Sequence, residues 1–277
     1  MTCLRIVTGA SGLIGAALTG YLAQLPGKLL ALDTRPADTT TGHQVLIADC
    51  AGQRFAELLV AHLDGVARAE LFHTAGLVPG LARIADTPPE DFARTLAGTL
   101  TATYATLRTF ARTTRERDLP AAAVLLSSAG ATRAHRYLVA YDAAKAATES
   151  LVRSFTLEYG TRLAVRAVAP GPLAQSASTA ADGDRLPALL ALVPRGAYTD
   201  LGDLVRALTA FGGPCFDSSA GHTLTLDGGL SIQLRPAALE RPPGPAGIPR
   251  PLTGDPDTGS HDSTPAAPDG QPVRGTR

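Results

Sequence analysis

Three polar side chains in the middle of the sequence have the residue types and the spacing that proton transfer requires. Tyr141 and Lys145 stand four residues apart in a helical pattern, and Ser128 ends an apolar run 13 residues before the tyrosine. A tyrosine hydroxyl has an ordinary pKa of about 10, and a neighbouring ammonium group lowers that pKa by stabilising the phenolate. Residues four apart share one face of a helix, so we predict that Tyr141 transfers a proton while Ser128 orients the substrate oxygen. The alternative is a half-buried tyrosine beside a surface lysine, because this spacing also occurs by chance in helices.

A glycine-rich turn follows the first apolar run of the chain. The turn, residues 9–15, comes directly after Cys3–Thr8 and opens a helical pattern. In this context the glycines predict a loop that binds the pyrophosphate of a dinucleotide at the N–H groups of a helix N-terminus. The predicted cofactor contacts of the loop are Gly9, Ser11, Gly12, Leu13, Ile14 and Gly15.

Two carboxylates end the next two apolar runs. Asp33 stands 18 residues after Gly15, where a carboxylate can bond the ribose hydroxyls of adenosine. A carboxylate there repels a 2′-phosphate, so the predicted cofactor is NAD. NADP is not excluded, because Arg35 lies two residues further on. Asp49 ends the third run and either reaches the adenine or caps the end of its strand.

The elements that must position these residues alternate between short apolar runs and longer helical patterns. Strands are expected over Cys3–Thr8, Lys28–Asp33, His43–Asp49, Ala69–Gly76, Ala121–Ser128, Arg162–Gly171 and Gly221–Gly229. Helices are expected over Leu13–Leu25, Arg54–Leu63, Asp91–Arg115 and Tyr141–Tyr159. This alternation predicts an α/β fold: a single-domain, Rossmann-type, doubly wound parallel sheet of about seven strands with helices on both faces. The carboxyl ends of such strands border the ligand crevice, which is where the glycine turn and Ser128 then lie.

The composition changes near the C-terminus. Residues 1–234 contain all the strand and helix patterns and are predicted to form the catalytic domain. Residues 235–277 are rich in Pro, Gly, Asp and Thr and contain few large apolar side chains. Such a segment buries too little apolar surface to offset the entropy of ordering it, so we predict a disordered tail.

Charge and cysteine content exclude several functional classes. The chain has 25 basic and 25 acidic residues, which gives no electrostatic footprint for nucleic acid or an anionic membrane. No apolar run is long enough to span a bilayer, and the first one begins too early for a signal peptide. The three cysteines and six histidines show neither a disulfide framework nor metal-ligand spacing. We therefore expect a cytoplasmic protein with no metal site, no membrane contact and no nucleic-acid partner.

Taken in chain order, the motifs resemble those of the short-chain dehydrogenase/reductase family from Arg5 to about Leu230. TGASGLIG (residues 8–15) resembles the cofactor loop of the family, and YDAAK (residues 141–145) resembles its Tyr-x-x-x-Lys pair. HTAG (residues 73–76) stands where the family has Asn-Asn-Ala-Gly, and PGPL (residues 170–173) resembles the turn beside the nicotinamide.

The resemblance implies hydride transfer between a nicotinamide and a carbonyl or alcohol carbon of a small molecule. Tyr141 would be the acid/base, Ser128 would orient the substrate oxygen, and Lys145 would bind the nicotinamide ribose. It also implies a homo-oligomer, a dimer or tetramer, that packs through the two long helices. The further cofactor contacts that it implies are Asp49, Cys50, Thr74, Ala75, Gly76, Tyr141, Lys145, Pro170, Gly171 and Leu173.

Three departures from the classical branch of the family keep two other functions open. Leu13 stands where that branch has a glycine, and His73 and Thr74 replace two asparagines; both features are similar to the extended, epimerase-like branch. Thr99 aligns with the asparagine that supports a proton-relay water. The alternatives are an epimerase or dehydratase without net redox change, and a catalytically impaired cofactor-binding partner subunit.

The resemblance also places segments of open function near the substrate. His135 and Arg136 lie between Ser128 and Tyr141, and they either bind an acidic group or face solvent. Ala174–Val193 stands where the family has a mobile substrate flap, and its leucines are also compatible with ordinary helix packing.

Overall fold

The computed structural model describes residues 2–36, 44–176, 183 and 186–234. Part of the predicted flap (residues 177–182 and 184–185) and the predicted tail (residues 235–277) lie outside the described residues. The disordered tail, the domain boundary at residue 234 and the closure of the flap therefore stay predictions.

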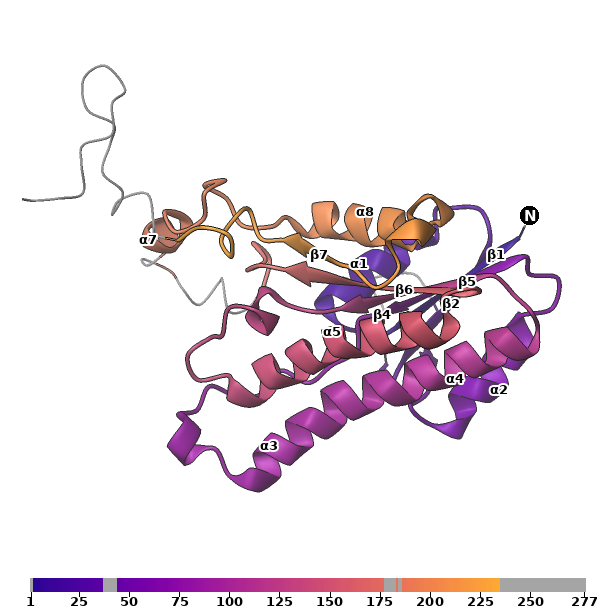
Figure 1. Cartoon of the computed structure of the whole chain (residues 1–277), viewed down its shortest axis with the longest axis horizontal. Coiled ribbons are helices and arrows are strands. Elements are labelled where there is room, and N and C mark those ends of the chain that lie inside the picture. Colours follow the sequence, from indigo (N-terminus) through magenta and orange to yellow (C-terminus); the bar gives the residue numbers. More distant parts are fainter. Residues whose placement is uncertain (1, 37–43, 177–182, 184–185, 235–277) are drawn as a thin grey trace, which may run out of the picture. The chain divides into compact units, whose positions relative to one another are not determined.

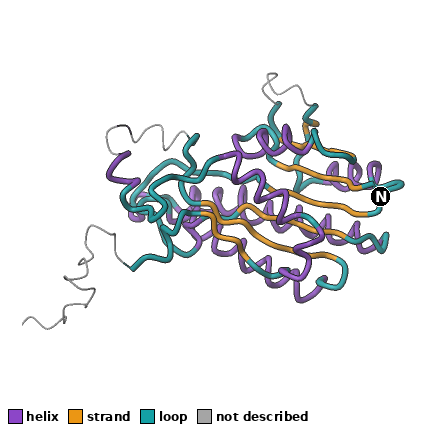
Figure 2. The backbone as a smooth tube through the Cα atoms, turned by 90° about the horizontal axis from the view of Figure 1, so that it is seen from above, coloured by secondary structure: helices purple, strands orange, loops and turns teal. Residues whose placement is uncertain are grey.

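Seven parallel strands form one sheet in the order β3-β2-β1-β4-β5-β6-β7. The strands are β1 (Cys3–Thr8), β2 (Lys28–Asp33), β3 (Leu46–Ile47), β4 (Arg68–His73), β5 (Ala121–Leu126), β6 (Leu163–Pro170) and β7 (Thr223–Leu226). Figure 2 shows them side by side, with helices passing over them. The strand order reverses between β1 and β4, and in such sheets ligands bind outside the carboxyl ends of the strands at this point. The predicted Rossmann-type fold is confirmed.

Helices cover both faces of the sheet (Figure 1). One face carries α1 (Leu13–Leu22) and α8 (Leu201–Gly212), which pack on Val7, Phe72 and Val124. The other face carries α2 (Gln53–His62), α4 (Ala102–Glu116) and α5 (Val139–Tyr159), which pack on Ile6, Leu71 and Leu125. Neighbouring residues of one strand thus enter opposite cores, and both cores are apolar.

The helical pattern expected over Asp91–Arg115 is interrupted in the structure. It consists of α3 (Pro89–Leu96), a π-helical turn η3 (Ala97–Thr101) and α4. A π-helical turn inserts one residue into the helix, and such turns occur frequently at functional sites. The expectation of one uninterrupted helix was therefore wrong at its centre. The short elements are η2 (Ile84–Asp86), η4 (Ala129–Ala131), α7 (Leu186–Leu190) and η6 (Pro214–Ser219).

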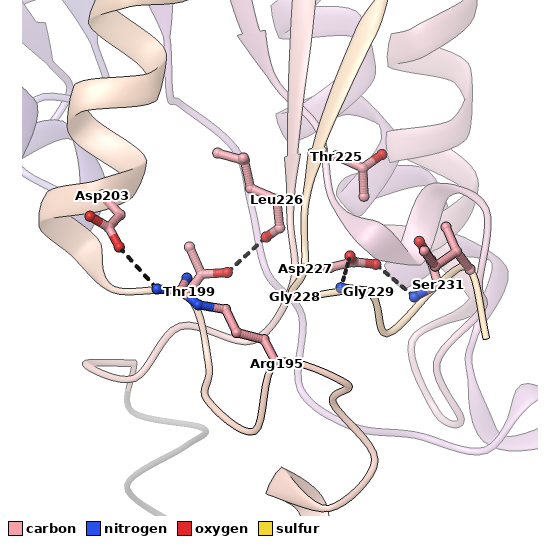
Figure 3. A pocket seen from close by; sticks show the side chains of 10 residues that line it. Arg195, Thr199, Asp203, Thr225, Leu226, Asp227, Gly228, Gly229 and Ser231 are labelled. Atoms are coloured by element: carbon pink, nitrogen blue, oxygen red, sulfur yellow. Dashed lines mark hydrogen bonds and ion pairs between the residues drawn. The ribbon is translucent and has the colours of Figure 1, made fainter. Parts of the chain in front are cut away.

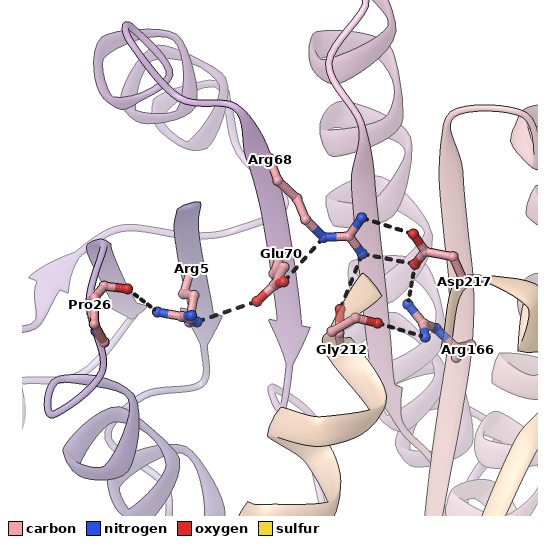
Figure 4. Close-up of polar contacts among 8 residues, drawn as sticks. Arg5, Pro26, Arg68, Glu70, Arg166, Gly212 and Asp217 are labelled. Atoms are coloured by element: carbon pink, nitrogen blue, oxygen red, sulfur yellow. Dashed lines mark hydrogen bonds and ion pairs between the residues drawn. The ribbon is translucent and has the colours of Figure 1, made fainter. Parts of the chain in front are cut away.

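A chain of five charged side chains crosses the sheet under α8 (Figure 4). Glu70 on β4 lies 3.3 Å from Nε of Arg5 and 3.2 Å from Nε of Arg68. Asp217 on η6 lies 2.8 Å from Nη2 of Arg68 and 3.2 Å from Nη2 of Arg166. The Arg166 side chain is 0% exposed, so its guanidinium depends on Asp217 for a neutralising charge.

The part of the chain that the structure describes contains neither a membrane-spanning helix nor a metal-binding cluster. None of the helices there combines the length and the apolar character needed to cross a bilayer. No group of three or more His, Cys, Asp or Glu side chains gathers there in a way that could hold a metal ion. Cys3, Cys50 and Cys215 are free thiols.

Candidate active site

The three predicted catalytic side chains lie together beyond the carboxyl end of β5. Ser128 lies two residues after this strand and is 8% exposed, and Tyr141 is half-buried as the third residue of α5. The two hydroxyl groups lie close enough for that of Ser128 to lower the pKa of Tyr141 by hydrogen bonding. Nζ of Lys145 lies 5.7 Å from the centroid of the Tyr141 ring and donates to the carbonyl of Leu126 at 2.6 Å. The predicted cluster of hydroxyl, phenol and amine is thus present at one place.

The electrostatics of this cluster differ from the sequence-based expectation. Burial raises the pKa of Tyr141 above its ordinary value, the hydrogen bond with Ser128 lowers that pKa, and the Asp142 carboxylate raises it further. Burial lowers the pKa of Lys145 to about 8. The expectation that Lys145 would leave Tyr141 with a lowered pKa was wrong, because burial dominates. At neutral pH the tyrosine therefore holds its proton and is ready to donate it.

The loops after β1 and β4 touch where the strand order reverses. Gly9 has φ of +75°, and a Cβ there would lie 2.6 Å from the amide nitrogen of Ala75. The backbone N–H and the hydroxyl of Thr74 both donate to the carbonyl of Thr8, at 3.0 and 2.8 Å. Gly12 closes the turn by donating to the carbonyl of Gly9 at 3.1 Å. The two predicted cofactor loops thus form one structure in front of α1.

Asp33 is fixed beside this structure at the end of β2. It is 8% exposed, and its carboxylate accepts from the backbone N–H groups of Ser11 and Arg35, each at 2.9 Å. The Arg35 side chain is 72% exposed, with Nε 3.8 Å from the carboxylate. The structure therefore brings the predicted ribose-binding carboxylate directly against the glycine turn.

The remaining residues of the predicted nucleotide site differ in solvent exposure and in hydrogen-bond partners. Leu13 is 46% exposed at the start of α1, whereas Ile14 packs into the core. Asp49 is exposed and accepts from the N–H of Ala51 at 2.9 Å, which is the capping contact named as its alternative role. Cys50 is buried, and its carbonyl accepts from a threonine hydroxyl on α4.

The turn Pro170–Leu173 begins at the last residue of β6 and leads into the predicted flap. A parallel bridge pairs Leu173 with Thr199, on the far side of that segment. The Gln175 side chain donates to the Asp200 carboxylate at 2.7 Å, and Asp200 caps the start of α8. Both ends of the predicted flap are therefore held against each other.

A cavity of about 370 Å³ lies nearby, at the end of β7 (Figure 3). Its lining residues are Arg195, Thr199, Asp203, Thr225, Leu226, Asp227, Gly228, Gly229, Ser231 and Ile232. The side chains of Ser128, Tyr141 and Lys145 are not part of this lining. The candidate active site is thus defined by those three side chains and not by this cavity.

Comparison with known proteins identifies the family. Residues 26–231 match the family model described as enoyl-(acyl carrier protein) reductase. An uncharacterized short-chain type dehydrogenase/reductase of Sinorhizobium fredii is 30% identical over 258 residues, which cover 86% of this chain and 46% of that protein. The chain belongs to the short-chain dehydrogenase/reductase family. It therefore spans less than half of the Sinorhizobium relative.

Other short-chain dehydrogenase/reductase relatives match over most of their length. The D-threitol dehydrogenase of Mycolicibacterium smegmatis is 26% identical over 247 residues, covering 83% of this chain and 93% of that enzyme. A solved oxidoreductase of the family from Burkholderia thailandensis has a TM-score of 0.73 at 25% identity, covering 84% of this chain and 94% of that one. A 3-ketoacyl-(acyl-carrier-protein) reductase from Brucella melitensis shares the fold, with a TM-score of 0.71 at 20% identity and coverage of 83% and 98%. The chain is thus a member of an oxidoreductase family.

In this short-chain dehydrogenase/reductase, Thr99 lies in the π-helical turn η3 and is 0% exposed. Its hydroxyl accepts from the N–H of Leu77 at 3.0 Å and donates to the carbonyl of Leu77 at 3.2 Å. Gly76 lies next to Leu77, and a Cβ there would lie 3.7 Å from Nζ of Lys145 and 3.7 Å from Cγ2 of Thr99. Thr99 thus fixes the loop that passes Lys145, a contact that the sequence did not reveal.

A buried histidine joins the same network. The hydroxyl of Thr103 donates to the carbonyl of Thr99 at 2.6 Å, so it must accept from Nε2 of His73 at 3.0 Å. Nδ1 of His73 then accepts from the Thr8 hydroxyl at 2.7 Å. Burial lowers the pKa of His73 to about 3, with a smaller contribution from Lys145, so the ring is neutral at pH 7. This series of hydrogen bonds connects the ends of β1 and β4 to α4.

Thr99→Val is expected to lower the free energy of unfolding by about 2 kcal/mol, because it removes the two hydrogen bonds that the buried Thr99 hydroxyl makes with the backbone of Leu77, each contributing about 1 kcal/mol. The measurement is urea unfolding followed by circular dichroism. Thr95→Val is the control, since Thr95 is also buried but bonds only to the carbonyl of Asp91 within its own helix. Equal losses in the two variants would contradict a special role for Thr99.

Proposed function

We propose that this chain is an NAD-dependent oxidoreductase that interconverts a ketone and a secondary alcohol on a small molecule. The observation that carries the proposal is the grouping of Ser128, Tyr141 and Lys145 beyond the end of β5, with the buried Nζ of Lys145 5.7 Å from the centroid of the tyrosine ring. The loops after β1 and β4 lie at the same edge of the sheet, next to Asp33. A nicotinamide would supply or accept the hydride.

The proposed mechanism assigns one task to each of the three side chains. Tyr141 donates its proton to the carbonyl oxygen as the carbonyl carbon is reduced, and it takes a proton back from the alcohol in the reverse reaction. Ser128 donates a hydrogen bond to the same oxygen and holds it in place. The ammonium of Lys145 stabilises the phenolate that remains on Tyr141, which offsets the burial that raises the pKa of this tyrosine.

The proposed cofactor contacts match the chemistry of a dinucleotide. The turn of residues 9–15 and the N-terminus of α1 offer backbone N–H groups to the pyrophosphate, and Asp33 accepts from ribose hydroxyls. The Brucella reductase of the same fold is described as a complex with NADH, which supports a nicotinamide as the cofactor class. The further proposed contacts are Asp49, Cys50, Thr74, Ala75, Gly76, Pro170, Gly171 and Leu173.

We propose a cytoplasmic homo-oligomer as its working form. Tyr104 on α4 is 45% exposed and Leu157 on α5 is 89% exposed. Apolar side chains exposed on both long helices support packing of a second copy there.

Asp33→Ala is expected to raise the Kd for NADH by about 10- to 100-fold, since a hydrogen bond to a charged group contributes about 1.5–3 kcal/mol. The Kd for NADPH rises less, because the carboxylate that repels the 2′-phosphate is also lost. A fluorescence titration with each nucleotide measures both constants. Glu57→Ala is the control, because Glu57 is an exposed carboxylate on α2 that pairs with Arg54. Absence of binding of either nucleotide to the unmodified protein would overturn the proposal.

The epimerase or dehydratase alternative rests on Leu13 and on His73 and Thr74. It predicts turnover without a net change in NADH absorbance. The impaired-subunit alternative predicts that cofactor binds but that no ketone or alcohol is converted.

A further inference from the structure

A carboxylate–imidazole pair lies beside Ser128 and has no part in the mechanism above. Nδ1 of His135 lies 2.8 Å from Oδ1 of Asp142, and the backbone N–H of His135 donates to Oδ2 of Asp142 at 2.6 Å. Asp142 is 7% exposed and directly follows Tyr141 on α5, whereas the His135 side chain is 43% exposed. One carboxylate thus holds both the backbone and the ring of His135 against the helix that carries Tyr141.

Gly130 lies between this pair and Ser128. A Cβ on Gly130 would overlap Oδ1 of Asp142 and would lie 2.6 Å from Cε1 of His135. Any side chain at this position would therefore push the pair apart. The backbone N–H of Gly130 donates to Oγ of Ser128 at 3.1 Å. The pair, the glycine and the serine are thus in continuous contact.

The hydrogen bond from Gly130 affects how the Ser128 hydroxyl takes part in further hydrogen bonds. A hydroxyl has a single proton to donate and can accept through its lone pairs. Oγ of Ser128 accepts from Gly130 through one lone pair, so its own proton stays available for donation, and donation toward Tyr141 agrees with the lowering of the Tyr141 pKa by Ser128. An oriented O–H donor at that place is what a substrate carbonyl oxygen needs.

The loop is restrained at a second point. Tyr137 has φ of +72°, a left-handed conformation that is strained for a residue with a side chain. Its carbonyl accepts from the N–H of Ala82, in the loop after β4, at 3.1 Å. Such strain persists only where surrounding contacts over-determine the backbone, and the bond from Ala82 is one of the contacts that hold Tyr137 in this conformation.

We propose that the His135–Asp142 pair positions the catalytic serine: it holds Gly130 where its N–H fixes Ser128 as a hydrogen-bond donor toward Tyr141 and the substrate oxygen. His135 and Asp142 are positioning residues, because they act through Gly130 and exchange no proton with the substrate. The inference rests on the proposed function for its catalytic meaning. The hydrogen-bond arrangement itself can be tested without a substrate.

The test is the NMR signal of the Tyr141 ring carbon Cζ, which reports the hydrogen bonding of its hydroxyl. Selective labelling of the six tyrosines of the full chain gives few signals, and Tyr141→Phe identifies the one of interest. Ser128→Ala is expected to move this signal. His135→Ala and Gly130→Ala are expected to move it in the same direction, and neither adds a further shift in the Ser128→Ala background.

Two further variants separate positioning from a general loss of structure. His135→Asn keeps a side-chain N–H donor for Asp142 and is expected to leave the signal near its position in the unmodified protein. His222→Ala removes an imidazole that precedes the amino end of β7, whereas Ser128 lies beyond the carboxyl end of β5. This variant is expected to leave the signal unmoved. If Ser128→Ala moves the signal but His135→Ala and Gly130→Ala do not, the pair only stabilises the loop and the inference is overturned.

Kinetics then test the catalytic meaning, with the ketone that the unmodified enzyme reduces in a screen. His135→Ala is expected to lower kcat by about 5- to 10-fold, the effect of one misplaced hydrogen bond, and to leave the Kd for NADH unchanged. Failure of the proposed function and failure of the positioning role give different results. A fully active Tyr141→Phe variant refutes the proposed function, whereas an inactive Tyr141→Phe beside a normal His135→Ala refutes only the positioning role.

Discussion

Tyr141→Phe is expected to lower kcat by about 10²- to 10⁴-fold, the usual contribution of a positioned general acid or base. The substitution removes only the hydroxyl group of Tyr141 and leaves a ring of the same shape in the half-buried site. NADH affinity is expected to stay within about twofold, because Lys145 and the glycine turn are untouched. The measurement is NADH consumption with the ketone found by screening, together with a fluorescence titration of the cofactor.

Tyr104→Phe is the matched control for this experiment. Tyr104 lies on α4, is 45% exposed and makes an edge contact with Phe155 at 6.2 Å. Removing its hydroxyl is expected to leave kcat unchanged. An active Tyr141→Phe enzyme would refute proton transfer by this residue, and the epimerase and impaired-subunit alternatives would then gain.

Much of the fold could be predicted because strand and helix patterns are local. The bounds expected for β1 and β2 are those observed, since each is a short apolar run bounded by polar or small residues. The third strand was expected over His43–Asp49. His43 lies outside the described residues, and within Gln44–Asp49 only Leu46–Ile47 pairs, with β2. It lies at the edge of the sheet, where a neighbour on one side alone supports few ladder bonds.

The π-helical turn was not predicted, and the contacts of its buried threonine are distant in the sequence. The bonds of Thr99 to Leu77 span 22 residues and depend on how α4 lies on the sheet. A π-helical turn differs from an α-helical turn by a single inserted residue, and the apolar pattern of residues 91–115 did not indicate where it lies.

The candidate site also combines residues that a local sequence pattern predicts with properties that only the tertiary structure determines. The Tyr-x-x-x-Lys spacing is local and identified Tyr141 and Lys145, but spacing says nothing about burial, and burial determines the pKa of Tyr141. The contact between His135 and Asp142 joins a loop to a helix across seven residues. A histidine before a tyrosine–aspartate pair was visible in the sequence, but no pattern indicated that the two side chains meet.

The buried charges illustrate the same limit. Arg5, Glu70 and Arg166 each stand inside an apolar run, where single charged residues usually point to solvent. Sheet register sets Arg5 opposite Glu70, and η6 then brings Asp217 to the arginines. Their interaction is a property of the tertiary structure, and its energetic consequence can be measured.

Asp217→Asn is expected to lower the free energy of unfolding by about 2 kcal/mol, less than the cost of breaking a fully buried ion pair because the Asp217 side chain is 43% exposed. The variant removes the charge that faces Arg166, whose side chain is 0% exposed and whose Nε has no hydrogen-bond partner. It also removes the charge from the two contacts to Arg68, at 2.9 and 2.8 Å. Urea unfolding measures the loss, and an unchanged Kd for NADH would show that the effect is confined to stability.

Asp118→Asn is the matched control, because it removes the same charge from an ion pair that water surrounds. Asp118 lies 2.9 Å from Arg162, and the two side chains are 75% and 51% exposed. Exposed pairs contribute about 0–1 kcal/mol, so this variant is expected to unfold close to the urea concentration of the unmodified protein. Similar midpoints for the two variants would mean that solvent reaches Arg166 in the folded protein. A large difference would instead show that burial of the arginines, and not the number of ion pairs, makes this cluster important for stability.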